Sequence, residues 1–195
     1  MFQFLSETCR SVPLSSLALW TALMSLAPDM TEILSRARAD LRMGVPVVLA
    51  GEGEAALVLA AETLDAGRLA DLRALGGAPV LAVTARRAET LKARPYDGDL
   101  ARLVLPPDAT LAWVLGVADP ADDLRTPMKG PLISQRDGPA DLHRLALKLA
   151  KSARLLPAAL VLPLTGADAF AGTHQLTRVD AVAAAALLVE ASPLH

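Results

Sequence analysis

The feature of this sequence that most constrains its fold is a pair of apolar runs joined by a short acidic turn. Residues 45–49 (VPVVL) and 56–61 (ALVLAA) are continuously apolar and bounded by turn-forming residues, which is typical of strands buried on both faces of a sheet. Residues 51–54 (GEGE) lie between them and can reverse the chain, because glycine adopts the positive φ that a tight turn requires. The sequence therefore predicts a buried β-hairpin around which the other segments are arranged.

The predicted turn carries two carboxylates, those of Glu52 and Glu54. They could hold a divalent cation, because carboxylate oxygens are among its preferred ligands. They could also form the solvated tip of a hairpin, and two glutamates alone favour this second interpretation.

Helical and strand-like segments alternate along the rest of the chain, which predicts an α/β fold. Gly44 stands where a helix C-cap is expected, and Asp65 is placed to cap the next helix. The sequence contains no internal repeat or low-complexity linker, so we predict a single domain. Predicted helices cover residues 31–43, 67–75, 84–93, 106–118, 139–151, 167–171 and 179 onward, and further strands cover 79–83, 100–105, 131–133 and 158–164.

The N-terminal segment contains an apolar run at residues 12–27 (VPLSSLALWTALMSLA). This run is shorter than the roughly 20 residues that cross a bilayer, and the segment before it lacks the positive start of a secretory signal. We therefore predict no membrane partner. Met24 is a second plausible start, so we interpret residues 1–29 as an N-terminal extension or an over-extended reading frame, and residues 30–195 as the domain.

Charge and cysteine content narrow the function classes. Nineteen Lys and Arg residues are scattered among 21 Asp and Glu residues, with a net charge of −2 and no basic block. This balance argues against a nucleic-acid partner, which would require a basic surface. The single cysteine, Cys9, permits neither an internal disulfide nor a cysteine-built zinc site, so a cytoplasmic location is expected.

The histidines do not show the spacing of a metal site. His143, His174 and His195 are too far apart in sequence to aim two imidazoles at one ion from a single helix or strand. His143 lies beside an apolar helix face, where a half-exposed surface residue and a metal ligand are both open interpretations. The sequence also lacks the nucleophile-elbow, phosphate-loop and dinucleotide motifs.

A polar segment at residues 119–138, rich in proline and glycine, reads as a long surface loop, where binding residues are often found. Its basic residues Arg125, Lys129 and Arg136 could bind a phosphate. Alternatively, they are solvated loop charges unless a pocket brings them together.

The order of the segments resembles 3,4-dihydroxy-2-butanone 4-phosphate synthase, the riboflavin-pathway enzyme, in the form fused to the N-terminus of GTP cyclohydrolase II. In that family a helix ending in glycine leads into a valine-rich strand, an acidic loop of the type DDEDRENEGD and a strand like LVMAAE. Here residues 44–49, 51–54 and 56–62 follow in this order, and further matching segments are 79–91 (PVLAVTARRAETL), 118–120 (ADP), 127–132 (PMKGPL) and 155–162 (LLPAALVL). The resemblance covers about residues 31–188 and implies a single-domain mixed sheet flanked by helices.

The chain also departs from the family pattern. The active synthase binds magnesium through a glutamate of the acidic loop and a histidine of a GHTEA motif, and it enolises ribulose 5-phosphate. Here the acidic loop is reduced to Glu52 and Glu54, and residues 138–143 read GPADLH, so the histidine is displaced to His143 or lost. The TTGIS-type phosphate contacts are also missing between residues 99 and 110. Because a magnesium site needs its ligands around one ion, we expect a synthase-like fold without synthase activity and without a cofactor.

Two alternatives stay open. A reduced site of Glu52, Glu54 and His143 could retain Mg²⁺ and bind a sugar phosphate, with Arg125 or Lys129 on the phosphate. An unrelated α/β binding module is also compatible with the sequence, because each matching segment is short.

The resemblance implies partners as well. GTP cyclohydrolase II works through a zinc ion held by three cysteines, and no such set occurs here, so zinc is expected only in a cyclohydrolase part beyond this chain. We therefore expect either the N-terminal part of a longer fused protein or a free-standing remnant that associates with a cyclohydrolase. A homodimer is also expected, and the apolar helix over residues 179–189 could supply its interface.

Overall fold

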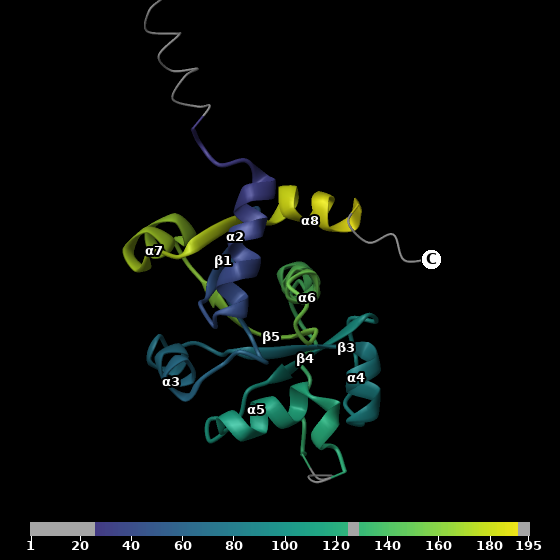
Figure 1. Cartoon of the computed structure of the whole chain (residues 1–195). Helices are drawn as coiled ribbons and strands as arrows, with labels where there is room; N and C mark the ends of the chain where they lie inside the picture. Colours follow the sequence, from purple (N-terminus) through teal and green to yellow (C-terminus); the bar gives the residue numbers. More distant parts are fainter. Residues whose placement is uncertain (1–25, 125–128, 191–195) are drawn as a thin grey trace, which may run out of the picture.

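A six-stranded mixed sheet runs through the protein, with helices on both of its faces (Figure 1). The computed structural model describes residues 26–124 and 129–190. Its strand order is β4-β3-β5-β2-β1-β6, in which β1 and β6 are parallel and the other neighbours are antiparallel. The strands are β1 (Val47–Ala50), β2 (Ala55–Ala60), β3 (Val80–Thr84), β4 (Leu100–Val104), β5 (Ala158–Leu164) and β6 (Thr177–Asp180).

The predicted hairpin lies inside this sheet, with β5 next to β2 and β6 next to β1. β1 pairs with β2 from Val47 opposite Val58 to Ala50 opposite Ala55, and every residue of β1 is buried. The turn is closed by the backbone N–H of Gly51, which donates to the carbonyl oxygen of Glu54 at 2.7 Å. Gly53 has a φ of +77°, which only glycine adopts without strain. The prediction of a hairpin buried on both faces is confirmed.

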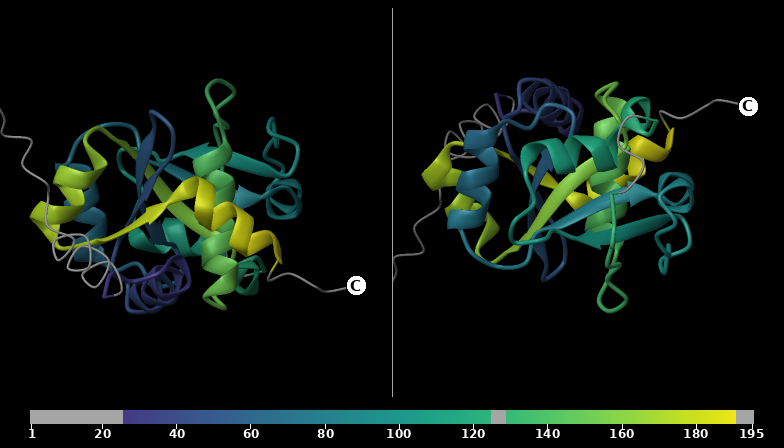
Figure 2. Two further views of the ribbon diagram at one scale, coloured as in Figure 1. Left: turned by 90° about the horizontal axis from the view of Figure 1, so that it is seen from above. Right: turned by 90° about the horizontal axis from the view of Figure 1, so that it is seen from below.

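Helices α2, α6 and α8 cover one face of the sheet, and α3, α4, α5 and α7 pack on the other face or along its margin (Figure 1). Seen from above, α8 crosses α6 (Figure 2). Both faces are apolar, so each layer of helices buries its own hydrophobic core against the sheet. The helices are α2 (Met30–Arg42), α3 (Ala66–Ala74), α4 (Ala85–Thr90), α5 (Leu111–Ala118), α6 (Asp141–Ser152), α7 (Ala167–His174) and α8 (Ala181–Glu190), with a 3₁₀ turn, η1, at Pro120–Asp122.

Helix α2 shows why the helix boundaries follow from the sequence. The Asp29 carboxylate accepts from the backbone N–H of Glu32 at 2.8 Å, and the Glu32 carboxylate accepts from the N–H of Asp29 at 2.9 Å. This capping box satisfies two donors that the first turn leaves unpaired. At the other end, Gly44 follows the helix with a φ of +73°. The predicted boundary between extension and domain remains a prediction, because residues 1–25 lie outside the described part.

Three predicted elements differ from the structure. Helix α5 begins at Leu111 rather than at residue 106, because the hydroxyl of Thr110 accepts from the N–H of Trp113 and caps the helix there. Residues 131–133 form no strand, and the next residue, Ser134, makes a single bridge to Leu103. Residues 177–180, where the predicted last helix began, form β6. The predicted class, a single α/β domain with a mixed sheet flanked by helices, is confirmed.

Candidate functional site

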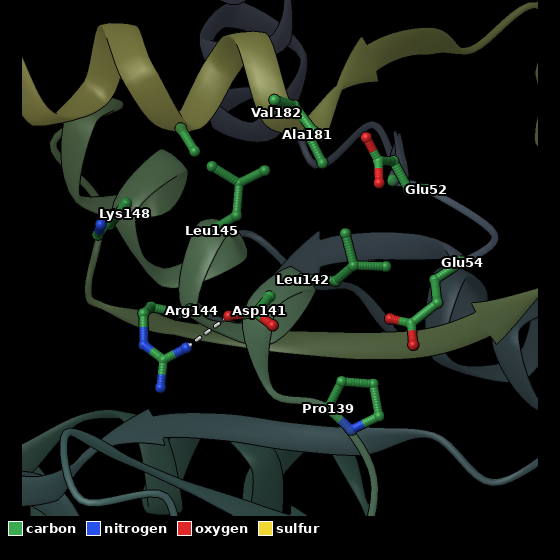
Figure 3. Close-up of a pocket in the computed structure, with 12 residues that line it drawn as sticks. Glu52, Glu54, Pro139, Asp141, Leu142, Arg144, Leu145, Lys148, Ala181 and Val182 are labelled. Carbon is green, nitrogen blue, oxygen red and sulfur yellow. Dashed lines mark hydrogen bonds and ion pairs between the residues drawn. The ribbon is translucent and has the colours of Figure 1, made fainter.

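The two glutamates of the hairpin turn, Glu52 and Glu54, line a pocket of about 530 Å³, which we call the turn pocket. It lies between this turn, the first turns of α6 and the start of α8 (Figure 3). Glu52 and Glu54 stand on one side of the pocket and Arg144 and Lys148 on the other, with apolar side chains such as Leu145 between them (Figure 3). The two turn glutamates therefore lie apart from the basic groups of the pocket, whereas Asp141 lies beside Arg144 (Figure 3).

The guanidinium of Arg144 is already paired with carboxylates. Its Nε and Nη2 donate to the two oxygens of Asp99 at 2.6 and 2.8 Å, and its Nη1 donates to Asp141 at 2.9 Å. Hydrogen bonding to Arg144 lowers the pKa of Asp99, and the same bonds raise the pKa of Arg144. This arrangement fixes the first turn of α6 beside the start of β4.

His143 lies away from the turn pocket. Its side chain is buried, with 8% of its surface exposed, and both ring nitrogens lack a hydrogen-bond partner among the described residues. Burial, with a smaller contribution from the positive charge of Arg102, lowers the pKa of His143 to about 4. The interpretation of His143 as a half-exposed surface residue is wrong, because the face of α6 that packs on the sheet is wide enough to include it.

His143 lines a second pocket of about 530 Å³, which we call the α6 pocket. This pocket lies between the first turn of α6, the loop before it and the sheet, and Glu54 stands at its margin. The structure thus brings Glu54 to both pockets. It places Glu52 in the turn pocket and His143 in the α6 pocket.

Arg102 forms one wall of the α6 pocket and has 1% of its surface exposed. It donates from Nε and Nη2 to both carboxylate oxygens of Asp97 at 2.8 and 2.9 Å. Its Nη1 donates to the carbonyl oxygens of Asp137 and Pro139 at 3.0 and 3.4 Å. Arg102 therefore fixes the loop that leads into α6. Arg102 is not among the candidate residues predicted from the sequence, although an arginine inside the apolar strand LARLV indicates a buried charge that needs a partner.

The described residues do not form the carboxylate–imidazole cluster that the resemblance implies for magnesium. Among the described residues, no three His, Cys, Asp or Glu side chains come together in a geometry that could hold a metal ion. Glu52 lines the turn pocket, His143 lines the α6 pocket, and Glu54 lines both. Pro139 and Ala140 precede the first turn of α6.

The proposed phosphate ligands do not gather at either pocket. Lys129 lies beside α5, where its ammonium donates to Asp123, and the same carboxylate binds Arg87. Hydrogen bonds from Arg87 and Lys129 hold the pKa of Asp123 well below its usual range. Arg136 stacks over the ring of Tyr96 at 4.7 Å. Arg125 lies outside the described residues.

The Arg87 side chain also binds the end of helix α5. It donates to the carbonyl oxygens of Val117, Gly116 and Asp119 at 2.7, 3.0 and 3.0 Å. These carbonyls belong to the last turn of α5, where they have no partner within the helix. Arg87 and Asp123 thus tie the C-terminal end of α5 to α4.

The fold is that of the 3,4-dihydroxy-2-butanone 4-phosphate synthases. A synthase from Candida albicans superposes with a TM-score of 0.57 over 80% of this chain and 96% of its own, at 15% identity. A cation-free synthase gives a TM-score of 0.59 over 81% and 97%, at 14% identity. A synthase in complex with two magnesium ions gives 0.57 over 85% and 98%, also at 14% identity. Identities this low show the fold alone.

The amino-acid sequence is also similar to that of a known protein. The chain is 36% identical over 156 residues to a GTP cyclohydrolase-2 of Azospirillum brasilense, covering 76% of this chain. It spans 40% of the length of that relative. No family model matches the chain. The resemblance to a synthase-like domain of a GTP cyclohydrolase II-type protein, predicted from segment order, is confirmed.

None of the helices in residues 26–124 and 129–190 combines the length and apolar character needed to cross a bilayer.

Proposed function

We propose that this chain is the synthase-like part of a GTP cyclohydrolase II-type protein of riboflavin biosynthesis, and that it acts as a structural module without synthase turnover. The observation that carries the proposal is the separation of the candidate ligands. Glu52 lines the turn pocket, the imidazole of His143 is buried in the α6 pocket, and Glu54 lines both. Among the described residues these candidates do not form a cluster of three metal ligands. In the synthase family that the chain resembles, a loop glutamate and a histidine hold one magnesium ion, which can then polarise the substrate as a Lewis acid. The separation of Glu52 from His143 supports the loss of such a site.

Turnover of ribulose 5-phosphate by the purified full chain tests this proposal. The assay would follow release of formate in the presence of Mg²⁺, with an active synthase such as the Candida albicans enzyme as the positive control. We expect a rate equal to the background without protein. Formate release proportional to the protein concentration would refute the loss of activity.

The alternative is a residual site for a divalent ion and a sugar phosphate. It is favoured by the turn pocket, which has Glu52 and Glu54 on one side and Lys148 on the other, next to Arg144, which is paired with Asp99 and Asp141 (Figure 3). Titration of Mg²⁺ and Mn²⁺ into the wild-type protein and into the Glu54→Ala variant distinguishes the two hypotheses. Glu89→Ala, which removes an exposed glutamate on α4, is the matched control. Under our proposal all three proteins bind the ions equally weakly, whereas the alternative requires weaker binding by Glu54→Ala alone.

The partner is proposed to be a cyclohydrolase part, either fused to this chain or associated with it. The match to 40% of a GTP cyclohydrolase-2 supports a longer protein. Immunoblotting of native extracts with an antibody against residues 30–190 measures the mass of the natural product. A product much heavier than 20.4 kDa supports the fused form, and a product of that mass supports association. The homodimer and the cytoplasmic location stay predictions.

A further inference from the structure

The α6 pocket has an apolar floor and a polar end. Its floor is formed by small side chains of three neighbouring strands, Ala56, Val80 and Val161. Its polar end is formed by Gln135, His143 and Arg102, from the loop before α6, the helix and β4. Pockets of about this size that combine an apolar lining with a few convergent polar groups are typical binding sites for small molecules.

The first turn of α6 lies at this pocket through Leu142 and His143, whereas its Asp141 lines the turn pocket and is paired with Arg144. Helix α6 has 12 residues, and Ala140 at its N-cap position provides no side-chain hydrogen bond. The N–H groups of Asp141, Leu142 and His143 therefore have no acceptor within the helix. Such a helix start carries roughly half a positive charge and favours anions.

His143 supplies an independent indication of a ligand. More than nine tenths of its surface is buried, it lines the α6 pocket, and neither ring nitrogen has a partner among the described residues. A buried polar group without a partner costs roughly 1–3 kcal/mol. A ligand that accepts a hydrogen bond from this imidazole would remove that cost.

The charges around the pocket indicate which kind of anion fits. The guanidinium of Arg102 is balanced by the carboxylate of Asp97, to which it makes two hydrogen bonds. Glu54 is exposed at the margin. The remaining attraction comes from the helix start and from a donor of a neutral imidazole, which together suit a single negative charge better than a dianion.

We propose that the α6 pocket binds a small organic carboxylate, with its apolar body on the floor formed by β2, β3 and β5. Its carboxylate accepts hydrogen bonds from the first turn of α6 and from the ring of His143. This inference goes beyond the proposed function, because it concerns binding without turnover or metal. Failure of the synthase assay to show activity therefore neither supports nor weakens it.

Calorimetric titration of the full chain with sodium benzoate, without added metal, tests the proposal. A ligand of this size should bind with a dissociation constant on the order of 1 mM. We expect binding at least roughly tenfold weaker for acetate, which lacks the apolar body, for benzyl alcohol, which lacks the charge, and for phenyl phosphate, which carries a second charge.

Three variants locate the site. His143→Leu should weaken benzoate binding roughly tenfold or more, and His143→Gln, which keeps a donor, should stay within about threefold of the wild type. His174→Leu, which changes an exposed histidine on α7, is the matched control and should bind like the wild type.

Several results would overturn the proposal. It is wrong if benzoate gives no binding at about 20 mM, well above the expected dissociation constant, or if His143→Leu binds benzoate like the wild type. If His143→Leu does not fold, the imidazole resonances of His143 in the wild-type protein decide the question. They should shift on addition of benzoate and not on addition of benzyl alcohol, and resonances that do not move contradict the site.

Discussion

Acidification should destabilise this protein through one buried residue, His143. Burial lowers its pKa to about 4 in the folded protein, from an ordinary value of 6.5. Because the folded-state pKa lies below the unfolded-state value, the unfolded chain binds the proton first as the pH falls. The free energy of unfolding therefore decreases below about pH 6.5. The contribution of this residue is absent at pH 7 and reaches its full size below the folded-state pKa.

The size of the effect follows from the two pKa values. At 1.36 kcal/mol per pH unit, the shift costs about 2 kcal/mol at pH 5 and about 3 kcal/mol at pH 4. Because only 8% of the His143 side chain is exposed, solvent does not screen this cost of protonating the ring. The loss is a large part of the 5–15 kcal/mol that holds a typical domain folded.

Urea unfolding of the wild type and of His143→Leu between pH 7 and 4.5 measures the contribution of His143 to the free energy of unfolding. Other groups titrate in both proteins, so their contributions cancel in the difference. At pH 7 the variant should be as stable as the wild type or more stable by about 1 kcal/mol, because two unpaired buried nitrogens are removed. The difference should then grow by about 2 kcal/mol towards pH 5. His174→Leu should keep the wild-type pH dependence. Parallel curves for wild type and His143→Leu would refute the reasoning.

Three further predictions concern stability and can be measured by denaturant unfolding at pH 7. Arg102→Met should cost about 3–5 kcal/mol, because it leaves the Asp97 carboxylate without its partner; a cost below about 1 kcal/mol would show that the pair is dispensable. Gly53→Ala should cost roughly 1 kcal/mol, because Gly53 has a positive φ, and Gly44→Ala should cost more. Both glycines have positive φ, but only at Gly44 would a Cβ meet a backbone oxygen, at 2.6 Å. Equal costs for the two variants would contradict this prediction. Thr110→Ala should cost about 1 kcal/mol by removing the cap of α5, and an unchanged stability would show that the cap is replaced.

The central hairpin could be predicted from the sequence because its determinants are local. Two apolar runs and a glycine turn specify both strands and their reversal, and the register from Val47 to Ala50 follows from the short turn. The caps at Asp29 and Asp65 are local in the same sense, since each carboxylate binds a backbone N–H three residues ahead. Elements of this kind need no knowledge of the tertiary structure.

The features that the sequence did not predict depend on distant contacts. Strand β6 (TRVD) is short and polar, and it exists because β1 offers it a parallel partner about 130 residues earlier in the chain. The burial of His143 depends on how far α6 rotates against the sheet and α8, which helical periodicity gives only to within a residue. For the same reason, the sequence placed Glu52, Glu54 and His143 in one hypothetical site, whereas the fold places Glu52 and His143 in different pockets and Glu54 in both.

The pairing of β6 with β1 also bears on synthesis at the ribosome. β1 is made early, but its outer edge stays unpaired until Thr177 and the residues after it have been translated. The Thr177 hydroxyl then reaches the Asp40 carboxylate at 2.6 Å, across 137 residues of sequence. Contacts between such distant positions are slow to form, and an unpaired strand edge invites association with other chains. The nascent chain should therefore need protection by chaperones until β6 leaves the exit tunnel.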